Sequence, residues 1–99
     1  MKFQIGISSE ARREITEIAL WYEDKRLGLG EEFLTSIIIY SEYLSNNAHS
    51  HPKVRGELRE LYIRRFPYVI IYHIIDEKDV VILGLVHTKM HPSKRKKRK

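Results

Sequence analysis

The 99-residue sequence contains no cysteine. Neither a disulfide framework nor a zinc site with thiolate ligands can therefore form. The sequence also has no apolar run that approaches the roughly 18 residues of a membrane-spanning helix. The first residues, Met1 to Ile5, lack the long apolar stretch of a signal peptide. We therefore expect a cytoplasmic protein that does not contact a membrane.

Signs of a bound cofactor are missing as well. The sequence has no glycine-rich phosphate loop and no dinucleotide-binding fingerprint, so we expect no nucleotide cofactor. Histidines are present, but His49 and His51 have no carboxylate close by in their loop and His73 lies within a predicted strand. These residues, and His91, do not have the spacing of metal ligands with supporting neighbours. We expect no metal site.

The positive charge of the chain is concentrated at its C-terminal end. The formal net charge is +5, and removing the six basic tail residues from the 18 in the chain leaves 12 basic residues against 13 acidic ones. Such a run attracts phosphates without reading base sequence. It is either a contact to nucleic acid or the ribosome, or only a solubilising end. The candidate nucleic-acid contacts in the tail are Lys94, Arg95, Lys96, Lys97, Arg98 and Lys99.

The first half of the chain has the periodicity of a strand followed by helices. Residues 2–7 alternate polar and apolar side chains, which is typical of a short strand. Ser8 or Ser9 can cap a helix over residues 9–26, whose apolar side chains recur at spacings of three and four: Ala11, Ile15, Ile18 and Tyr22. A Leu-Gly-Leu-Gly segment ends it. The apolar positions that follow predict a second, antiparallel helix over residues 31–45.

The second half changes to the periodicity of strands. After a polar loop at residues 46–53, three apolar segments predict strands that form an antiparallel meander: 57–65, 69–75 and 80–86. Gly84 within the last of them permits a close approach or a bulge. We expect an α+β fold of order β-α-α-β-β-β, with an antiparallel helical hairpin on one face of a four-stranded, mostly antiparallel sheet. A chain of this length makes one domain, residues 1–92, followed by a basic tail, residues 93–99.

Three local patterns accompany this element order. They are Ala11-x-x-Glu14-Ile15-x-x-Ile18-x-x-Trp21-Tyr22, Gly28-Leu29-Gly30-Glu31-Glu32-Phe33-Leu34, and Arg65-Phe66-Pro67-Tyr68-Val69-Ile70-Ile71-Tyr72, the last followed by His87 and Pro92. Over residues 1–92 the chain resembles the RelE/ParE family of toxins, the plasmid stabilisation type. The resemblance implies the toxin of a type II toxin–antitoxin system, which arrests growth and forms a hetero-oligomer with its antitoxin.

The resemblance leaves the activity open, because some members of the family cut mRNA on the ribosome and others inhibit DNA gyrase without catalysis. Metal-independent RNA cleavage needs a base, an acid and cations that stabilise the phosphorane. The candidate catalytic residues are Arg65 as a phosphate clamp, Tyr72 as a stacking or hydrogen-bonding group, and His87 as acid or base. Each also has a structural interpretation: a solvated strand-end charge, an ordinary sheet tyrosine and a sheet-edge histidine.

Further candidates lie on these strands or just after them. Arg64 and Lys89 are candidate phosphate contacts, and Glu57 and Glu60 are proton acceptors or plain surface carboxylates. Our first hypothesis is a ribosome-dependent endoribonuclease, an mRNA interferase, with ribosome and mRNA as partners. The alternatives are a non-enzymatic inhibitor of DNA gyrase and a catalytically inert relative that only binds antitoxin.

Overall fold

The computed structural model describes residues 2–90. In this range the chain forms two α-helices, two short 3₁₀ helices and a five-stranded sheet with the strand order β1-β5-β4-β3-β2. All neighbouring strands are antiparallel except the pair of β1 and β5. The elements are β1 (Gln4–Ile7), α1 (Ser9–Lys25), α2 (Leu29–Asn47), η1 (Ala48–Ser50), β2 (Lys53–Arg55), β3 (Leu58–Tyr62), β4 (Tyr68–Ile74), β5 (Asp79–His87) and η2 (Thr88–Met90).

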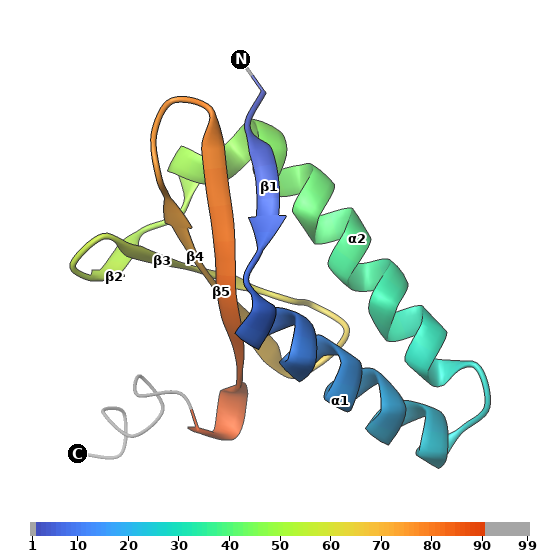
Figure 1. The fold of residues 1–99 in the computed structure, drawn as a ribbon. Coiled ribbons are helices and arrows are strands. Elements are labelled where there is room, and N and C mark those ends of the chain that lie inside the picture. Colours follow the sequence, from blue (N-terminus) through green and yellow to red (C-terminus); the bar gives the residue numbers. More distant parts are fainter. Residues whose placement is uncertain (1, 91–99) are drawn as a thin grey trace, which may run out of the picture.

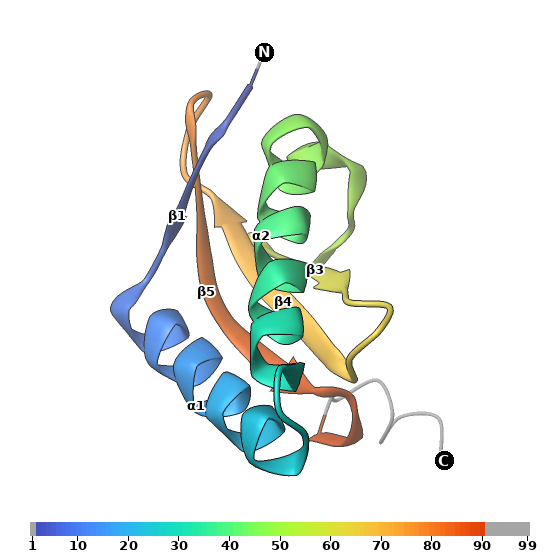
Figure 2. The same ribbon diagram turned by 90° about the vertical axis from the view of Figure 1, so that its right-hand side faces the viewer.

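The two helices run in opposite directions and cover the same face of the sheet (Figures 1 and 2). The α+β class and the antiparallel helical hairpin on one sheet face are therefore confirmed. None of the helices within residues 2–90 is long and apolar enough to cross a membrane.

The predicted number of strands is wrong, because the sheet has five strands and not four. The additional strand is β2, which pairs with β3 through Lys53 and Arg55 around a turn at Gly56. All three residues of β2 are exposed. A strand at the sheet edge with no buried face produces no alternation of polar and apolar residues, so the sequence pattern could not reveal it.

The helix α2 is longer than predicted, and it replaces the first part of the expected loop at residues 46–53. Its N-terminus follows Gly28, which has φ +88°, a conformation that favours glycine. The carboxylate of Glu23 on α1 accepts hydrogen bonds from the N–H groups of Gly28 at 2.9 Å and Gly30 at 3.0 Å. A side chain of the first helix thus caps the second.

The helix α1 is held against β5 by a carboxylate. Glu14 accepts a hydrogen bond from the N–H of Leu85 at 2.9 Å, next to an irregularity in the register of β4 and β5 at Ile71 and Tyr72. A Cβ atom at Gly84 would lie 3.1 Å from the same carboxylate oxygen. Glycine at this position therefore permits the close approach, as predicted.

The hydrophobic core lies between the helices and the sheet. Its largest fully buried side chains come from α2, β4 and β5: Tyr72, Phe33, Leu44, Ile70, Ile82 and Val80. Helix α1 contributes small and β-branched residues, Ala11, Ile15 and Ala19. The N-terminal cap of α1 is Ser8, whose Oγ accepts the N–H of Ala11 at 3.0 Å.

Candidate functional site

One end of the sheet brings together two segments that are distant in the sequence, the loop between β3 and β4 and the end of β5 (Figure 1). The N–H of Thr88 donates to the carbonyl of Pro67 at 2.9 Å. Phe66 is buried in this loop and packs edge-on against two rings of the helical hairpin, with centroid distances of 4.9 Å to Tyr22 and 5.2 Å to Phe33. This packing holds the loop that carries Arg65 beside the end of β5 that carries His87.

Arg65 is engaged by the helical hairpin. Its guanidinium forms an ion pair with the carboxylate of Glu32, near the start of α2. Arg26 approaches the same carboxylate oxygen at 3.3 Å. The hydrogen bonds from Arg65 and then Arg26 hold the pKa of Glu32 below its usual range. The Arg65 side chain is 57% exposed and lies over the ring of Phe66 at 5.2 Å. In this position Arg65 shares the single carboxylate of Glu32 with Arg26, so the three side chains together keep a net positive charge.

His87 lies at the end of β5, opposite Tyr68, and its ring meets the tyrosine ring at a centroid distance of 5.1 Å. The Nδ1 atom accepts a hydrogen bond from the backbone N–H of Lys89 at 3.0 Å. A neutral His87 therefore carries its proton on Nε2 and presents a donor, not a base, to its surroundings.

Tyr72 does not reach the surface, and its predicted contact with RNA is wrong. The side chain is completely buried, and its hydroxyl donates a hydrogen bond to the carbonyl of Ala48 at 2.7 Å. Burial raises the pKa of Tyr72 to about 12. It also lies four residues along β4 from Tyr68, the partner of His87, which is roughly 13 Å in a strand. Tyr72 therefore has a role in the core.

The remaining candidates are spread over the surface. Arg64 and Lys89 are both exposed at the end of the sheet that carries Arg65 and His87, so they remain candidate phosphate contacts. Glu57 forms an exposed ion pair with Lys53 at 3.1 Å. The six basic residues of the tail, 94–99, lie outside the described residues.

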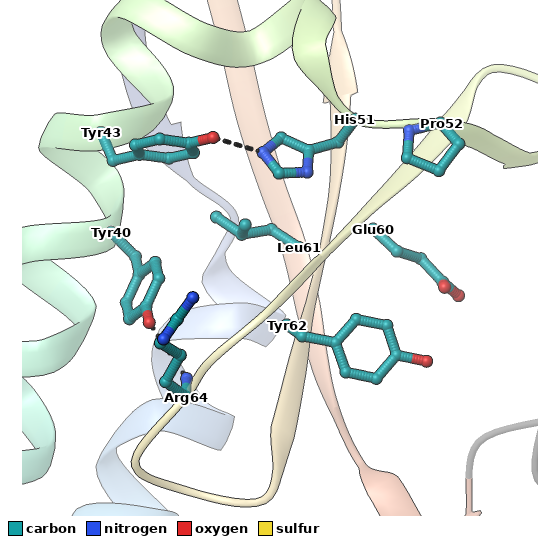
Figure 3. A pocket seen from close by; sticks show the side chains of 8 residues that line it. All are labelled: Tyr40, Tyr43, His51, Pro52, Glu60, Leu61, Tyr62 and Arg64. Atoms are coloured by element: carbon teal, nitrogen blue, oxygen red, sulfur yellow. Dashed lines mark hydrogen bonds between the residues drawn. The ribbon is translucent and has the colours of Figure 1, made fainter.

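A hollow of about 440 Å³ lies between α2 and β3, beside Arg64 (Figure 3). Tyr40 and Tyr43 project into it from α2, and the Tyr43 hydroxyl is 2.7 Å from Nε2 of His51. The Tyr40 hydroxyl accepts the backbone N–H of Arg64 at 3.0 Å. The lining is completed by Pro52, Glu60, Leu61 and Tyr62. The hollow thus combines aromatic rings, an imidazole and a cation.

Sequence reasoning missed the tyrosines of this hollow. Tyr40 and Tyr43 are three residues apart, so a helix places them on one side, and this spacing was a readable signal. Their opposite wall could not be inferred, because the approach of β3 to α2 depends on packing. Among residues 2–90, the structure contains no group of three or more acidic, histidine or cysteine side chains that could hold a metal ion.

The sequence of the chain matches one family of known proteins over nearly its whole length. The family model described as ParE toxin of type II toxin-antitoxin system, parDE, matches residues 5–92. The chain belongs to the ParE toxin family. Membership confirms the resemblance to RelE/ParE toxins and makes the chain a toxin of a type II toxin–antitoxin system. No curated protein sequence matches it significantly.

Two solved structures share the fold of this ParE-family toxin. A chromosomal ParDE toxin–antitoxin system from P. aeruginosa is similar with a TM-score of 0.70 and 18% sequence identity, over 87% of this chain and 96% of the other. The toxin–antitoxin complex RelBE2 from Mycobacterium tuberculosis is similar with a TM-score of 0.64 and 22% identity, over 88% and 99% of the two chains. At these identities the similarity establishes the fold and leaves the mode of action open.

Proposed function

We propose that this toxin arrests growth by binding its target rather than by cutting RNA, and that the target is DNA gyrase. The observation that carries the proposal is that the three candidate catalytic residues do not surround one point. Tyr72 is buried in the core, Arg65 is paired with Glu32, and Nδ1 of His87 accepts the N–H of Lys89. Metal-independent cleavage requires a base, an acid and a phosphate clamp around one point, and the separation of Tyr72 from Arg65 and His87 supports a mode of action by binding.

Ribosome-dependent mRNA cleavage is the second candidate function. It is favoured by the gathering of basic and imidazole side chains at one end of the sheet, where Arg64, Arg65, His87 and Lys89 lie. Cleavage would require Arg65 to leave Glu32, and the ribosome to supply the groups that the toxin lacks. Both candidate targets are cytoplasmic, and we place the toxin there.

The decisive experiment offers the purified toxin both targets. Gyrase supercoiling is measured with increasing toxin, and programmed ribosomes are incubated with the toxin before the 5′ ends of the message are mapped. We expect loss of supercoiling and an intact message. A cleaved message with unaffected gyrase would establish the nuclease instead. If neither target responds, the chain is an inert relative and the proposal is overturned. A toxin preincubated with antitoxin is the control and should be inactive in both assays.

The antitoxin is the second partner in this proposal. It should form a hetero-oligomer with the toxin and cover surface beside the helical hairpin or along a sheet edge. The hairpin exposes apolar side chains, with Trp21 58% and Leu27 88% accessible. Lys25 lies over the Trp21 ring at 4.7 Å. A purified complex between toxin and antitoxin would show the pairing directly.

A further inference from the structure

The hollow between α2 and β3 has walls that hydrogen bonds hold in place. The guanidinium of Arg59 on β3 donates to the carbonyl of His51 at 2.6 Å, and Nε2 of His51 lies 2.7 Å from the hydroxyl oxygen of Tyr43. At the other end of the hollow, the hydroxyl of Tyr40 accepts the backbone N–H of Arg64 at 3.0 Å (Figure 3). A partner would therefore meet an ordered surface, and binding to an ordered surface costs less conformational entropy.

The inside of the hollow is aromatic and apolar. Leu61 points from β3 toward the tyrosines of α2, whereas Glu60 and Tyr62 project on the other side of the strand (Figure 3). Leu61 is buried, with 6% of its surface exposed, and Tyr43 is 38% exposed. An accessible ring beside a buried apolar side chain provides a place where an apolar side chain of a partner is removed from water. Tyrosine and arginine are also the residue types enriched at the energetic centres of protein interfaces.

Arg64 places a positive charge at the rim of the hollow. Its side chain is exposed, and within residues 2–90 its guanidinium forms no ion pair and no hydrogen bond. The neighbouring Arg65 differs, because it is paired with Glu32. Tyr40 holds the backbone of Arg64, so the start of the Arg64 side chain has a fixed position. A carboxylate from a partner would give this guanidinium the charge-assisted hydrogen bonds that it lacks in the free toxin.

The charges around the hollow favour a protein segment over a strand of nucleic acid. The lining contains one basic residue, Arg64, and one acidic residue, Glu60, whose formal charges cancel when His51 is counted as neutral. Surfaces that bind nucleic acid are much more positively charged, because each nucleotide brings a phosphate. A single arginine beside tyrosine rings instead suits a single carboxylate that stands next to an apolar side chain.

We propose that this hollow holds the protein target of the toxin, through a target segment that presents a carboxylate next to an apolar or aromatic side chain. The apolar side chain lies over Leu61 and against the ring of Tyr43, and the carboxylate pairs with Arg64. The inference rests on the proposed function, in which the target is DNA gyrase. It adds the surface through which the toxin binds gyrase and the chemistry of the segment that gyrase supplies.

Inhibition of gyrase by variants of the hollow tests the proposal. Supercoiling is measured with increasing amounts of wild-type toxin, Arg64→Gln and Tyr43→Ala. Arg64→Gln removes the charge and keeps the backbone N–H that donates to Tyr40. We expect the toxin concentration for half inhibition to rise at least roughly 10-fold for each variant, because central interface residues carry most of the binding energy. The matched controls, Arg55→Gln on β2 and Ile39→Ala on α2, replace exposed residues outside the lining and should stay within about 2-fold of wild type.

Thermal unfolding and antitoxin binding are measured for the same variants, and Arg64→Gln should match wild type in both. If Tyr43→Ala lowers the unfolding temperature, Arg64→Gln alone decides the test. Hollow variants that inhibit gyrase as well as the controls do would reject the hollow and leave the proposed function standing. A wild-type toxin that does not inhibit gyrase would overturn both. A hollow variant that folds normally but loses antitoxin binding to the same degree would assign the hollow to the antitoxin, which also overturns the proposal.

Binding to nucleic acid distinguishes the protein segment from a nucleotide. Short single-stranded oligonucleotides of DNA and of RNA are titrated with the same variants, and fluorescence anisotropy follows binding. We expect Arg64→Gln to weaken binding no more than Arg55→Gln, since each removes one exposed charge, and Tyr43→Ala to leave binding unchanged. A loss of affinity confined to Arg64→Gln and Tyr43→Ala would make the hollow a nucleotide site and overturn its assignment to a protein segment.

Discussion

The hydroxyl of Tyr72 ends in the core, where it donates to the carbonyl of Ala48 and ties β4 to the segment after α2. Tyr72→Phe keeps the ring and removes only this bond. Because the carbonyl of Ala48 is left without its partner, we expect the free energy of unfolding to fall by about 1–2 kcal/mol. Urea titration of both proteins measures the difference. An unchanged midpoint would mean that another group satisfies Ala48.

The same residue predicts how stability depends on pH. Burial raises the pKa of Tyr72 from an ordinary 10.0 to about 12. The pKa of Tyr72 in the folded protein lies above its pKa in the unfolded chain. The contribution of the neutral phenol to the free energy of unfolding is therefore complete below pH 10 and is lost as the pH rises toward 12. Urea midpoints at increasing alkaline pH should therefore fall more steeply for the wild-type protein than for Tyr72→Phe. Parallel curves for the two proteins would contradict the assignment.

His87 separates the two modes of action at the scale of a single residue. If the toxin acts by binding gyrase, His87→Gln should leave growth arrest nearly intact, since an interface spread over many contacts tolerates one change. If the toxin cuts RNA through this imidazole, the same variant should lose roughly 10²- to 10⁴-fold in activity. Growth after induction measures arrest, and antitoxin binding controls for folding. Loss of arrest with normal antitoxin binding would refute the non-enzymatic proposal.

At the scale of elements, the two helices are joined through a side chain of α1 and backbone N–H groups at the start of α2. Glu23 on α1 caps the first N–H groups of α2. A Cβ atom at Gly30 would overlap the carbonyl oxygen of Ala19, so only glycine lets the helices approach this closely. Glu23→Ala should destabilise the fold by about 1–2 kcal/mol, as the loss of a helix cap does. Glu31→Ala, an exposed acid in the same region, is the control for charge, and equal unfolding midpoints would refute the role of the cap.

At the scale of the whole molecule, the net positive charge is concentrated in the last residues of the sequence. The helices, the strands and the core of the structure lie within residues 2–90, whereas six positive charges follow at residues 94–99. Deletion of 94–99 should leave thermal unfolding unchanged. It should weaken binding to nucleic acid and flatten its salt dependence, because the shortened chain neutralises fewer phosphates and so releases fewer counterions. Identical salt slopes for the full-length and shortened proteins would make the tail only a solubilising end.

Periodicity was sufficient for the elements that bury one face. The apolar spacing of Ala11, Ile15 and Ile18 indicates α1, and the apolar segment at residues 69–75 indicates β4, because burial selects side chains at the period of the backbone. The exposed strand β2 has no such selection and was not predicted. The family could also be recognised from the sequence, because its patterns are local runs of residues such as the one that begins at Arg65.

The candidate site was only partly determined by sequence. The position of His87 at the end of a strand followed from the local pattern, whereas Arg65, predicted at the end of a strand over residues 57–65, lies in the loop after β3, which ends at Tyr62. Register and the packing of α2 against the sheet decided the rest. They set the side of the sheet that Tyr72 faces, the carboxylate that pairs with Arg65 and the N–H that donates to Nδ1 of His87. These are contacts between residues distant in the chain, such as Arg65 with Glu32. Only the tertiary structure decides them, because a one-residue shift in register turns a core side chain toward solvent.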